Sequence, residues 1–147
     1  MIRRILHLYW RMKRGMTLGV RGVVLRGDEV LLVRHGYTPG WHLPGGGVEP
    51  GETFEEALAK ELLEEGNVRM TGAPKLHALF LNRNASSRDH VAVYVVRAFE
   101  YGGPLAPNLE IREASFFPLH GLPDGTTQST RRRLTEILDG VPPPALW

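Results

Sequence analysis

Three glutamates, Glu61, Glu64 and Glu65, recur close together on a segment that should be helical. At about 100° per residue of an α-helix, their side chains fall within an arc of roughly 100°. Like charges at such spacings destabilise a helix by about 0.2–0.5 kcal/mol per pair, and Lys60 is the only cation between residues 53 and 66. A hard divalent cation such as Mg²⁺ or Mn²⁺ would balance the carboxylates and would also accept phosphate oxygens. We therefore expect a metal site, with a solvated acidic helix face as the alternative.

A run of glycines precedes this helix. Gly45 to Gly47 allow the backbone to come close to a ligand or a metal, and the polar loop that follows contains Glu52. Thr53 and Glu56 have the spacing of a capping box, which predicts that the helix begins at Thr53. Three glycines alone are compatible with a flexible turn, but their place directly before a capped acidic helix favours a functional loop.

The segment from Gly46 to Val68 resembles the Nudix box, a sequence signature written G-x5-E-x7-R-E-U-x-E-E-x-G-U, in which U is apolar. The positions that match at the required spacing are Gly46, Glu52, Glu61, Leu62, Glu64, Glu65 and Val68. Two positions depart from the pattern, because Lys60 stands in place of arginine and Asn67 in place of glycine. The resemblance implies the α/β/α sandwich of the Nudix hydrolase family, with a mixed β-sheet between helices.

The resemblance also implies an activity and a cofactor. The expected reaction is hydrolysis of a pyrophosphate bond in a nucleoside diphosphate linked to another moiety, with Mg²⁺, or Mn²⁺, as cofactor. By motif position, the metal ligands would be Glu61, Glu64, Glu65 and the backbone carbonyl of Gly45. Glu61 is also a candidate for orienting or deprotonating the attacking water. Glu52 and Lys60 complete the expected catalytic set by bracing the loop, although lysine lacks the two-pronged hydrogen bonding of arginine.

Residues outside the box must select the substrate. Those that flank the expected cleft beside Gly46 are Arg34, His35, Tyr37 and Trp41. An arginine can bind phosphate and an aromatic ring can stack on a base. The alternative is that Arg34 is only solvated and that Trp41 only packs in the core.

Four further residues are candidates near the second half of the chain. Glu110 or Glu113 could supply another metal ligand or the general base, whereas Asp89 and His90 are weaker candidates at the end of a polar loop. The run from Arg131 to Arg133 is expected on the exposed side of the last helix rather than at the site.

The bulk composition predicts one globular domain. The chain has 147 residues, 42% of them hydrophobic, and a formal charge of +2. The absence of cysteine excludes disulfides and thiolate metal sites, and it favours a reducing compartment, so we expect a cytoplasmic protein. The mild basic excess fits an anionic small-molecule substrate and does not predict a stable nucleic-acid partner. A homodimer is compatible with the sequence.

The expected organisation has three parts. Residues 1–15 form a basic helical segment, residues 16–140 the Nudix-type domain, and residues 141–147 a proline-rich tail beyond the ordered part. The apolar run before Arg11 is short and contains His7, so it does not predict a secretory signal. A basic amphipathic segment could touch a membrane surface, but we expect no membrane partner. We expect it to pack on the domain or to fray.

Hydrophobic patterning gives the order of elements within the domain. Strands are expected at 17–25, 30–33, near 41–43, at 76–81, 91–99 and 114–117, with helices at 53–65 and 127–138.

Two other functions are compatible with the same residues. The domain could be a sensor that binds a nucleotide ligand without cleaving it, a reading favoured only by the lysine at position 60. It could also be an RNA 5′-end pyrophosphohydrolase, which requires a strongly basic cleft and binding that weakens steeply with salt. The mild net charge argues against the RNA substrate.

Overall fold

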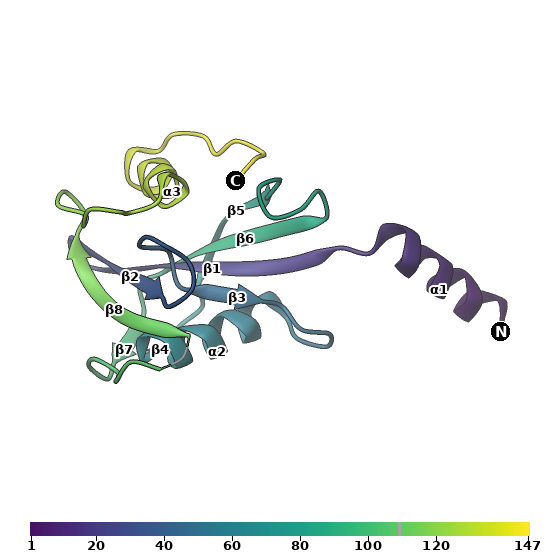
Figure 1. Ribbon diagram of the computed structural model, residues 1–147, viewed down its shortest axis with the longest axis horizontal. Helices are drawn as coiled ribbons and strands as arrows, with labels where there is room; N and C mark the ends of the chain where they lie inside the picture. Colours follow the sequence, from purple (N-terminus) through teal and green to yellow (C-terminus); the bar gives the residue numbers. More distant parts are fainter. Residues whose placement is uncertain (109) are drawn as a thin grey trace.

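The computed structural model describes residues 1–108 and 110–147. Figure 1 shows a central β-sheet with one helix on each face and a third helix that projects from one end. The helices are α1 (Ile2–Arg14), α2 (Phe54–Gly66) and α3 (Gln128–Asp139). The strands are β1 (Thr17–Arg26), β2 (Glu29–His35), β3 (Gly45–Gly47), β4 (Val68–Met70), β5 (Lys75–Leu81), β6 (Asp89–Val96), β7 (Phe99–Tyr101) and β8 (Ile111–Pro118).

The main sheet is mixed and has the order β5-β6-β1-β2-β8, with β3 added beside β1. Strands β1 and β6 run parallel, whereas β1 and β2 form the antiparallel hairpin expected around Gly27. Helix α2 covers one face and α3 the other (Figure 1). The predicted α/β/α sandwich with a mixed sheet is therefore confirmed. Strands β4 and β7 form a separate two-stranded sheet.

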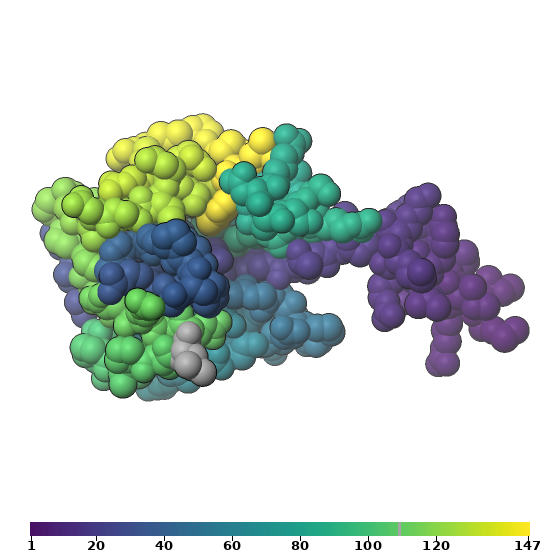
Figure 2. Space-filling model, viewed as in Figure 1, coloured from purple at the N-terminus to yellow at the C-terminus, as the bar shows by residue number. Residues whose placement is uncertain are grey.

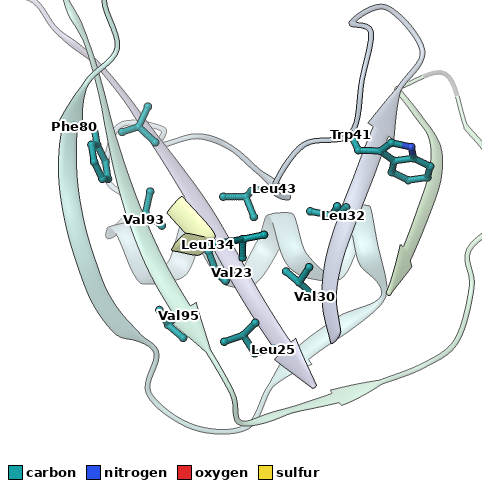
Figure 3. Close-up of a cluster of buried hydrophobic side chains, with 11 residues drawn as sticks. Val23, Leu25, Val30, Leu32, Trp41, Leu43, Phe80, Val93, Val95 and Leu134 are labelled. Carbon is teal, nitrogen blue, oxygen red and sulfur yellow. The ribbon is translucent and has the colours of Figure 1, made fainter. Parts of the chain in front are cut away.

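The two faces of the sheet carry separate hydrophobic cores. On β1, Val23 faces the α3 side, where it belongs to a cluster with Leu134 of α3, shown in Figure 3. Val20 and Val24 point to the opposite face and belong to the cluster that contains Leu58 of α2. Because both faces are covered, central strands are apolar on both sides, which explains the nearly continuous hydrophobic run in β1.

Helix α2 begins and ends where the sequence predicts. The Thr53 side chain accepts a hydrogen bond from the Glu56 N–H, and the Glu56 side chain accepts one from the Thr53 N–H, so the capping box is confirmed. At the other end Asn67 adopts the left-handed conformation with φ of 53°, which asparagine tolerates better than most residues. The Asn67 side-chain amide also donates to the Gly103 carbonyl at 3.1 Å, a contact that glycine could not make.

The short strand near 41–43 is displaced along the chain. Trp41 and His42 form only isolated bridges. The glycine run that follows them forms β3, which pairs with β1. Gly45, at φ of 153°, passes so close to β1 that an added Cβ would lie 1.9 Å from the Val20 carbonyl oxygen. Glycine has a low propensity for β-strands, so the sequence did not predict a strand at this position. The strand forms because glycine lets its backbone approach β1 closely.

Strand β6 also ends earlier than the sequence suggests. The expected strand 91–99 is divided into β6 and β7, and the short strand β4 that pairs with β7 was not anticipated.

Two expectations about the C-terminal region are wrong. The tail belongs to the ordered fold, because the Trp147 N–H donates to the Leu81 carbonyl at 3.1 Å and the indole ring packs edge-on against Phe80. Arg133 is fully buried instead of exposed, with its guanidinium 4.0 Å from the Phe80 ring centre and hydrogen-bonded to Glu136. The buried carboxylate and the two aromatic rings explain why this one arginine turns inward.

Helix α1 does not pack on the domain, which was one of the two arrangements expected for it. None of its side chains is buried, and it projects from the start of β1 away from the sheet (Figure 1). No helix in the described part of the chain is long and apolar enough to cross a bilayer.

Candidate active site

The three glutamates of α2, Glu61, Glu64 and Glu65, line one open pocket of about 460 Å³ on the α2 side of the sheet. Glu110, from the loop before β8, lines the same pocket, so four carboxylates face a common space. Glu64 is exposed, Glu61 is half-buried and Glu65 is buried. From the sequence, Glu110 was a candidate outside the box, and the fold brings it close to the box residues.

Glu65 ties the helix to the glycine strand. Its Oε2 accepts a hydrogen bond of 2.9 Å from the Gly45 N–H, and its Oε1 lies 3.6 Å from His35 Nε2. Both side chains of this pair are less than a tenth exposed. The carboxylate is therefore held between β2, β3 and α2. The carbonyl of Gly45, which motif position assigns to the metal, belongs to the same residue whose N–H anchors Glu65.

Glu61 lies against the second glycine of the strand. A Cβ built on Gly46 would be 2.6 Å from the Glu61 carboxyl carbon, so only glycine leaves room for this side chain. The pKa of Glu61 is raised, first by burial and then by the negative charges of Glu65 and Glu64. The site thus gathers more negative charge than its surroundings balance.

The excess of negative charge and the types of donor atom decide whether a divalent cation fits this site. Mg²⁺ and Mn²⁺ prefer a few carboxylate oxygens together with water, and the pocket supplies such oxygens beside open space. Across residues 1–108 and 110–147, no three His, Asp or Glu side chains already converge as a finished ligand set. The contacts of Glu65 account for part of this, since one oxygen accepts a hydrogen bond from the Gly45 N–H and the other faces His35. The donor types and their grouping fit a hard cation.

Lys60 and Glu52 join the helix to the loop, as motif position implies. Lys60 Nζ lies 3.1 Å from Glu52 Oε2, and Glu52 Oε1 accepts a 2.9 Å hydrogen bond from the Glu49 N–H. The pKa of Glu52 is lowered by that backbone N–H and then by Lys60, and the pKa of Lys60 is raised by Glu52. The lysine therefore substitutes for the arginine of the box, but through a single nitrogen.

We predict that Lys60→Met lowers kcat/KM about tenfold, the size typical of losing an outer support of a metal site. Among the described residues, the Glu52 carboxylate then keeps only its hydrogen bond from the Glu49 N–H. Because an exposed ion pair contributes at most about 1 kcal/mol, the free energy of unfolding should change little. Lys60→Arg is the matched control, and it should equal or exceed the parent because guanidinium donates two parallel hydrogen bonds. Steady-state kinetics and urea unfolding measure both; unchanged kcat/KM in Lys60→Met would contradict the bracing role.

The predicted substrate residues separate into two groups. Arg34, His35 and Tyr37 line a second depression of about 440 Å³, which Arg112 also lines. His35 stacks on Tyr37 with ring centres 5.5 Å apart, and Arg34 makes an ion pair of 3.1 Å with Glu113.

Trp41 is not available as a stacking platform. Only 8% of it is exposed, and its ring packs edge-on against Phe117 at 4.7 Å. The expectation that it binds a base is therefore wrong, and its packing alternative is the one that the structure shows. Arg34 lies 5.4 Å from its ring centre.

A third pocket, of about 280 Å³, was not anticipated. It lies between β1, β3, β6, the start of α3 and the tail, and its polar lining includes Arg21, His42, Asn82, Asp89, Ser129 and Thr130. Gly46 and Gly47 line it too, so the glycine strand separates this pocket from the carboxylates. The sequence signal was Arg21, a charge in the middle of a mostly apolar strand.

One polar group in this pocket lacks a partner. Asn82 Nδ2 donates to Asp89 Oδ2 at 3.2 Å, whereas Asn82 Oδ1 is buried and accepts no hydrogen bond from the described residues. A buried carbonyl without a donor is costly, and this oxygen has almost no accessible surface although the residue lines the pocket. Asp89, a weak candidate from sequence, is thus at a pocket, whereas His90 does not line it.

Comparison with known proteins agrees with this geometry. Residues 16–137 match the family model described as NUDIX domain. An ADP-ribose pyrophosphatase from Methanocaldococcus jannaschii is 34% identical over 113 residues, which is 73% of this chain and 64% of that protein. A MutT-like protein from Streptomyces ambofaciens is 30% identical over 128 residues, covering 86% of this chain and 80% of that protein.

Solved structures show the same fold. The crystal structure of a MutT NUDIX hydrolase from Burkholderia pseudomallei superposes with a TM-score of 0.71 at 24% identity, covering 82% of this chain and 97% of the other. The chain spans less than two thirds of the length of the M. jannaschii relative. The match of the family model extends from the residue before β1 into α3. It thus includes the glycine strand and every box glutamate. The chain belongs to the NUDIX family.

Proposed function

We propose that this chain is a metal-dependent hydrolase that cleaves the pyrophosphate bond of a nucleoside diphosphate linked to another moiety. The observation that supports it most is the position of β3. One side of this glycine strand lies against Glu65 and Glu61, which share their pocket with Glu64 and Glu110, and the other side lines the pocket that contains Arg21 and Asn82. A diphosphate lying along the strand would have its negative charge beside the metal site and its nucleoside in the pocket.

Glu61, Glu64, Glu65 and the Gly45 carbonyl are the groups that would hold the metal. When bound, a divalent cation neutralises the phosphate oxygens and supplies most of the stabilisation of the transition-state charge. Glu61, which lies against Gly46 in the carboxylate pocket, is also our candidate for orienting or deprotonating the attacking water. Glu110 is the other carboxylate placed to accept a proton from water, since Glu113 is engaged by Arg34.

The nucleoside would be bound by polar groups of the pocket beside the glycine strand. Arg21 supplies a positive charge close to the glycine strand, and the side chains of Asn82, Asp89 and Ser129 add polar groups to the wall of the same pocket. The basic depression of Arg34 and Arg112 is suited to the moiety on the other side of the diphosphate, such as a second phosphate or a sugar.

A turnover screen tests this function. Purified full chain is incubated with Mg²⁺ and then with Mn²⁺ against ADP-ribose, nucleotide sugars, dinucleoside polyphosphates, nucleoside triphosphates and 5′-triphosphate RNA. ADP-ribose comes first because the M. jannaschii relative carries that name. Release of a nucleoside monophosphate that stops with EDTA supports the proposal. Ligand binding without turnover would favour a sensor, and turnover confined to RNA would favour the RNA-end reading.

A location in the cytoplasm, the absence of a stable nucleic-acid partner and a homodimeric state remain predictions from the sequence.

A further inference from the structure

Helix α1 presents a large apolar surface to solvent. Its side chains are exposed throughout, for example 61% at Ile5, 49% at Leu6 and 76% at Met12. In Figure 2 the helix lies apart from the domain and joins it only at its C-terminal end. Burying such side chains contributes about 1.5–3 kcal/mol each, so a helix of this composition has a strong tendency to find an apolar partner.

The helix is divided into a narrow basic face and a wide apolar face. At about 100° per residue, Arg3, Arg4, His7, Arg11 and Arg14 fall within an arc of roughly 100°. The apolar side chains cover the opposite arc of roughly 200°; they are Ile2, Ile5, Leu6, Leu8, Tyr9, Trp10 and Met12. Lys13 alone lies within the apolar arc, where its long stem can reach out to water.

Charge is segregated between the helix and the domain. Residues 1–14 contain five of the 18 lysines and arginines and none of the 16 acidic residues. The remaining 13 basic and 16 acidic side chains give the rest of the chain a formal charge of −3. Two more exposed cations, Arg83 and Arg88, lie in the loop next to the C-terminal end of α1. Arg88 Nη1 donates to the Gly15 carbonyl at 2.6 Å, so this loop and the helix are joined.

We propose that α1 binds the surface of an anionic membrane, with its apolar face in the headgroup layer and its basic face towards lipid phosphates. A short helix with basic residues on one face and tryptophan among aliphatic residues on the other has the composition of interfacial helices. Tyr9 and Trp10 suit the boundary between hydrocarbon and water. This proposal replaces the expectation of no membrane partner and does not depend on the enzymatic function.

A second copy of the chain explains the helix less well. The helix has no acidic side chain with which another α1 could pair. The exposed apolar side chains of the domain are spread over several elements, with Leu63 on α2, Leu79 on β5 and Leu138 on α3. An anionic bilayer, in contrast, can bury the whole apolar face while its lipid phosphates attract the cations around that face.

Co-sedimentation of the full chain with vesicles tests the proposal. One set of vesicles contains only phosphatidylcholine, and the other contains phosphatidylcholine with phosphatidylglycerol. We expect binding to the anionic set only, with a blue shift of fluorescence that is absent in Trp10→Phe. Reversing two charges with Arg4→Glu and Arg11→Glu should weaken binding on the order of tenfold or more. Ile5→Ser with Leu6→Ser should abolish it.

The matched control removes the same charge from the domain. Lys75→Glu with Arg97→Glu changes two exposed cations at β5 and after β6, and it should bind vesicles as the parent does. All altered side chains are exposed, so folding is expected to be unaffected. The proposal is overturned if the chain stays in the supernatant or if the α1 variants pellet like the parent. It is also overturned if the α1 changes affect only dimerisation or RNA binding in lipid-free solution.

Discussion

Replacing Glu64 with glutamine will abolish metal-dependent turnover without destabilising the fold. The side chain is exposed and lines the carboxylate pocket, so the change removes one charge and little packing. We expect kcat to fall roughly a hundredfold to a thousandfold, the magnitude of removing one preorganised charge-stabilising group. In the absence of metal, the free energy of unfolding should stay equal or rise by about 0.2–0.5 kcal/mol, because a like-charge repulsion is removed.

The matched control makes the same chemical change on the same helix. Glu55 lies in the first turn of α2, is exposed and does not line the pocket, so Glu55→Gln should keep its activity. Steady-state kinetics with a titration of Mg²⁺ and urea unfolding with and without Mg²⁺ provide the readouts. Retained turnover in Glu64→Gln, or equal losses in both variants, would contradict the assignment of the metal site.

The second large effect is expected from a single methyl group. In Gly46→Ala the new Cβ would lie 2.6 Å from the Glu61 carboxyl carbon, so the carboxylate or the strand must move. Since a displacement of about 1 Å at a catalytic group can cost a hundredfold in rate, we expect kcat to fall by about that factor. The protein should remain folded, because Glu61 is only half-buried and can swing into the pocket.

The adjacent glycine provides the control. At Gly47 an added Cβ meets nothing within 4 Å, and its φ is not positive, so Gly47→Ala should be tolerated. Kinetics of the two variants, with circular dichroism to check folding, separate displacement of Glu61 from a general stiffening of the glycine strand. Equal loss of activity in both would contradict the role of Gly46 in leaving room for Glu61.

Local signals in the sequence predicted the parts of the site that lie close together along the chain. The capping box at Thr53 and the left-handed tolerance of Asn67 set the two ends of α2, and the spacing of the glutamates set the face that they share. The contact of Lys60 with Glu52 spans eight residues and also follows from the motif. The helix ends and the shared face depend on helix geometry, which local sequence largely specifies.

The remaining parts depend on contacts between distant segments. Strand β3 exists because Gly45 fits against β1, and neither residue type nor hydrophobic pattern signals that approach. Arg133 is buried by Phe80 and Trp147, which come from β5 and the tail. The pocket containing Asn82 joins β1, β3, β6 and α3, so no local pattern could identify it.

The most direct test of the central claim is hydrolysis in water enriched in ¹⁸O. The best substrate of the screen is incubated with the full chain and Mg²⁺, and the products are analysed by mass spectrometry. We predict one ¹⁸O atom in a phosphoryl group of one monophosphate product, and no product when EDTA replaces Mg²⁺. Label on a sugar carbon, or equal turnover in EDTA, would contradict metal-dependent attack of water on the pyrophosphate.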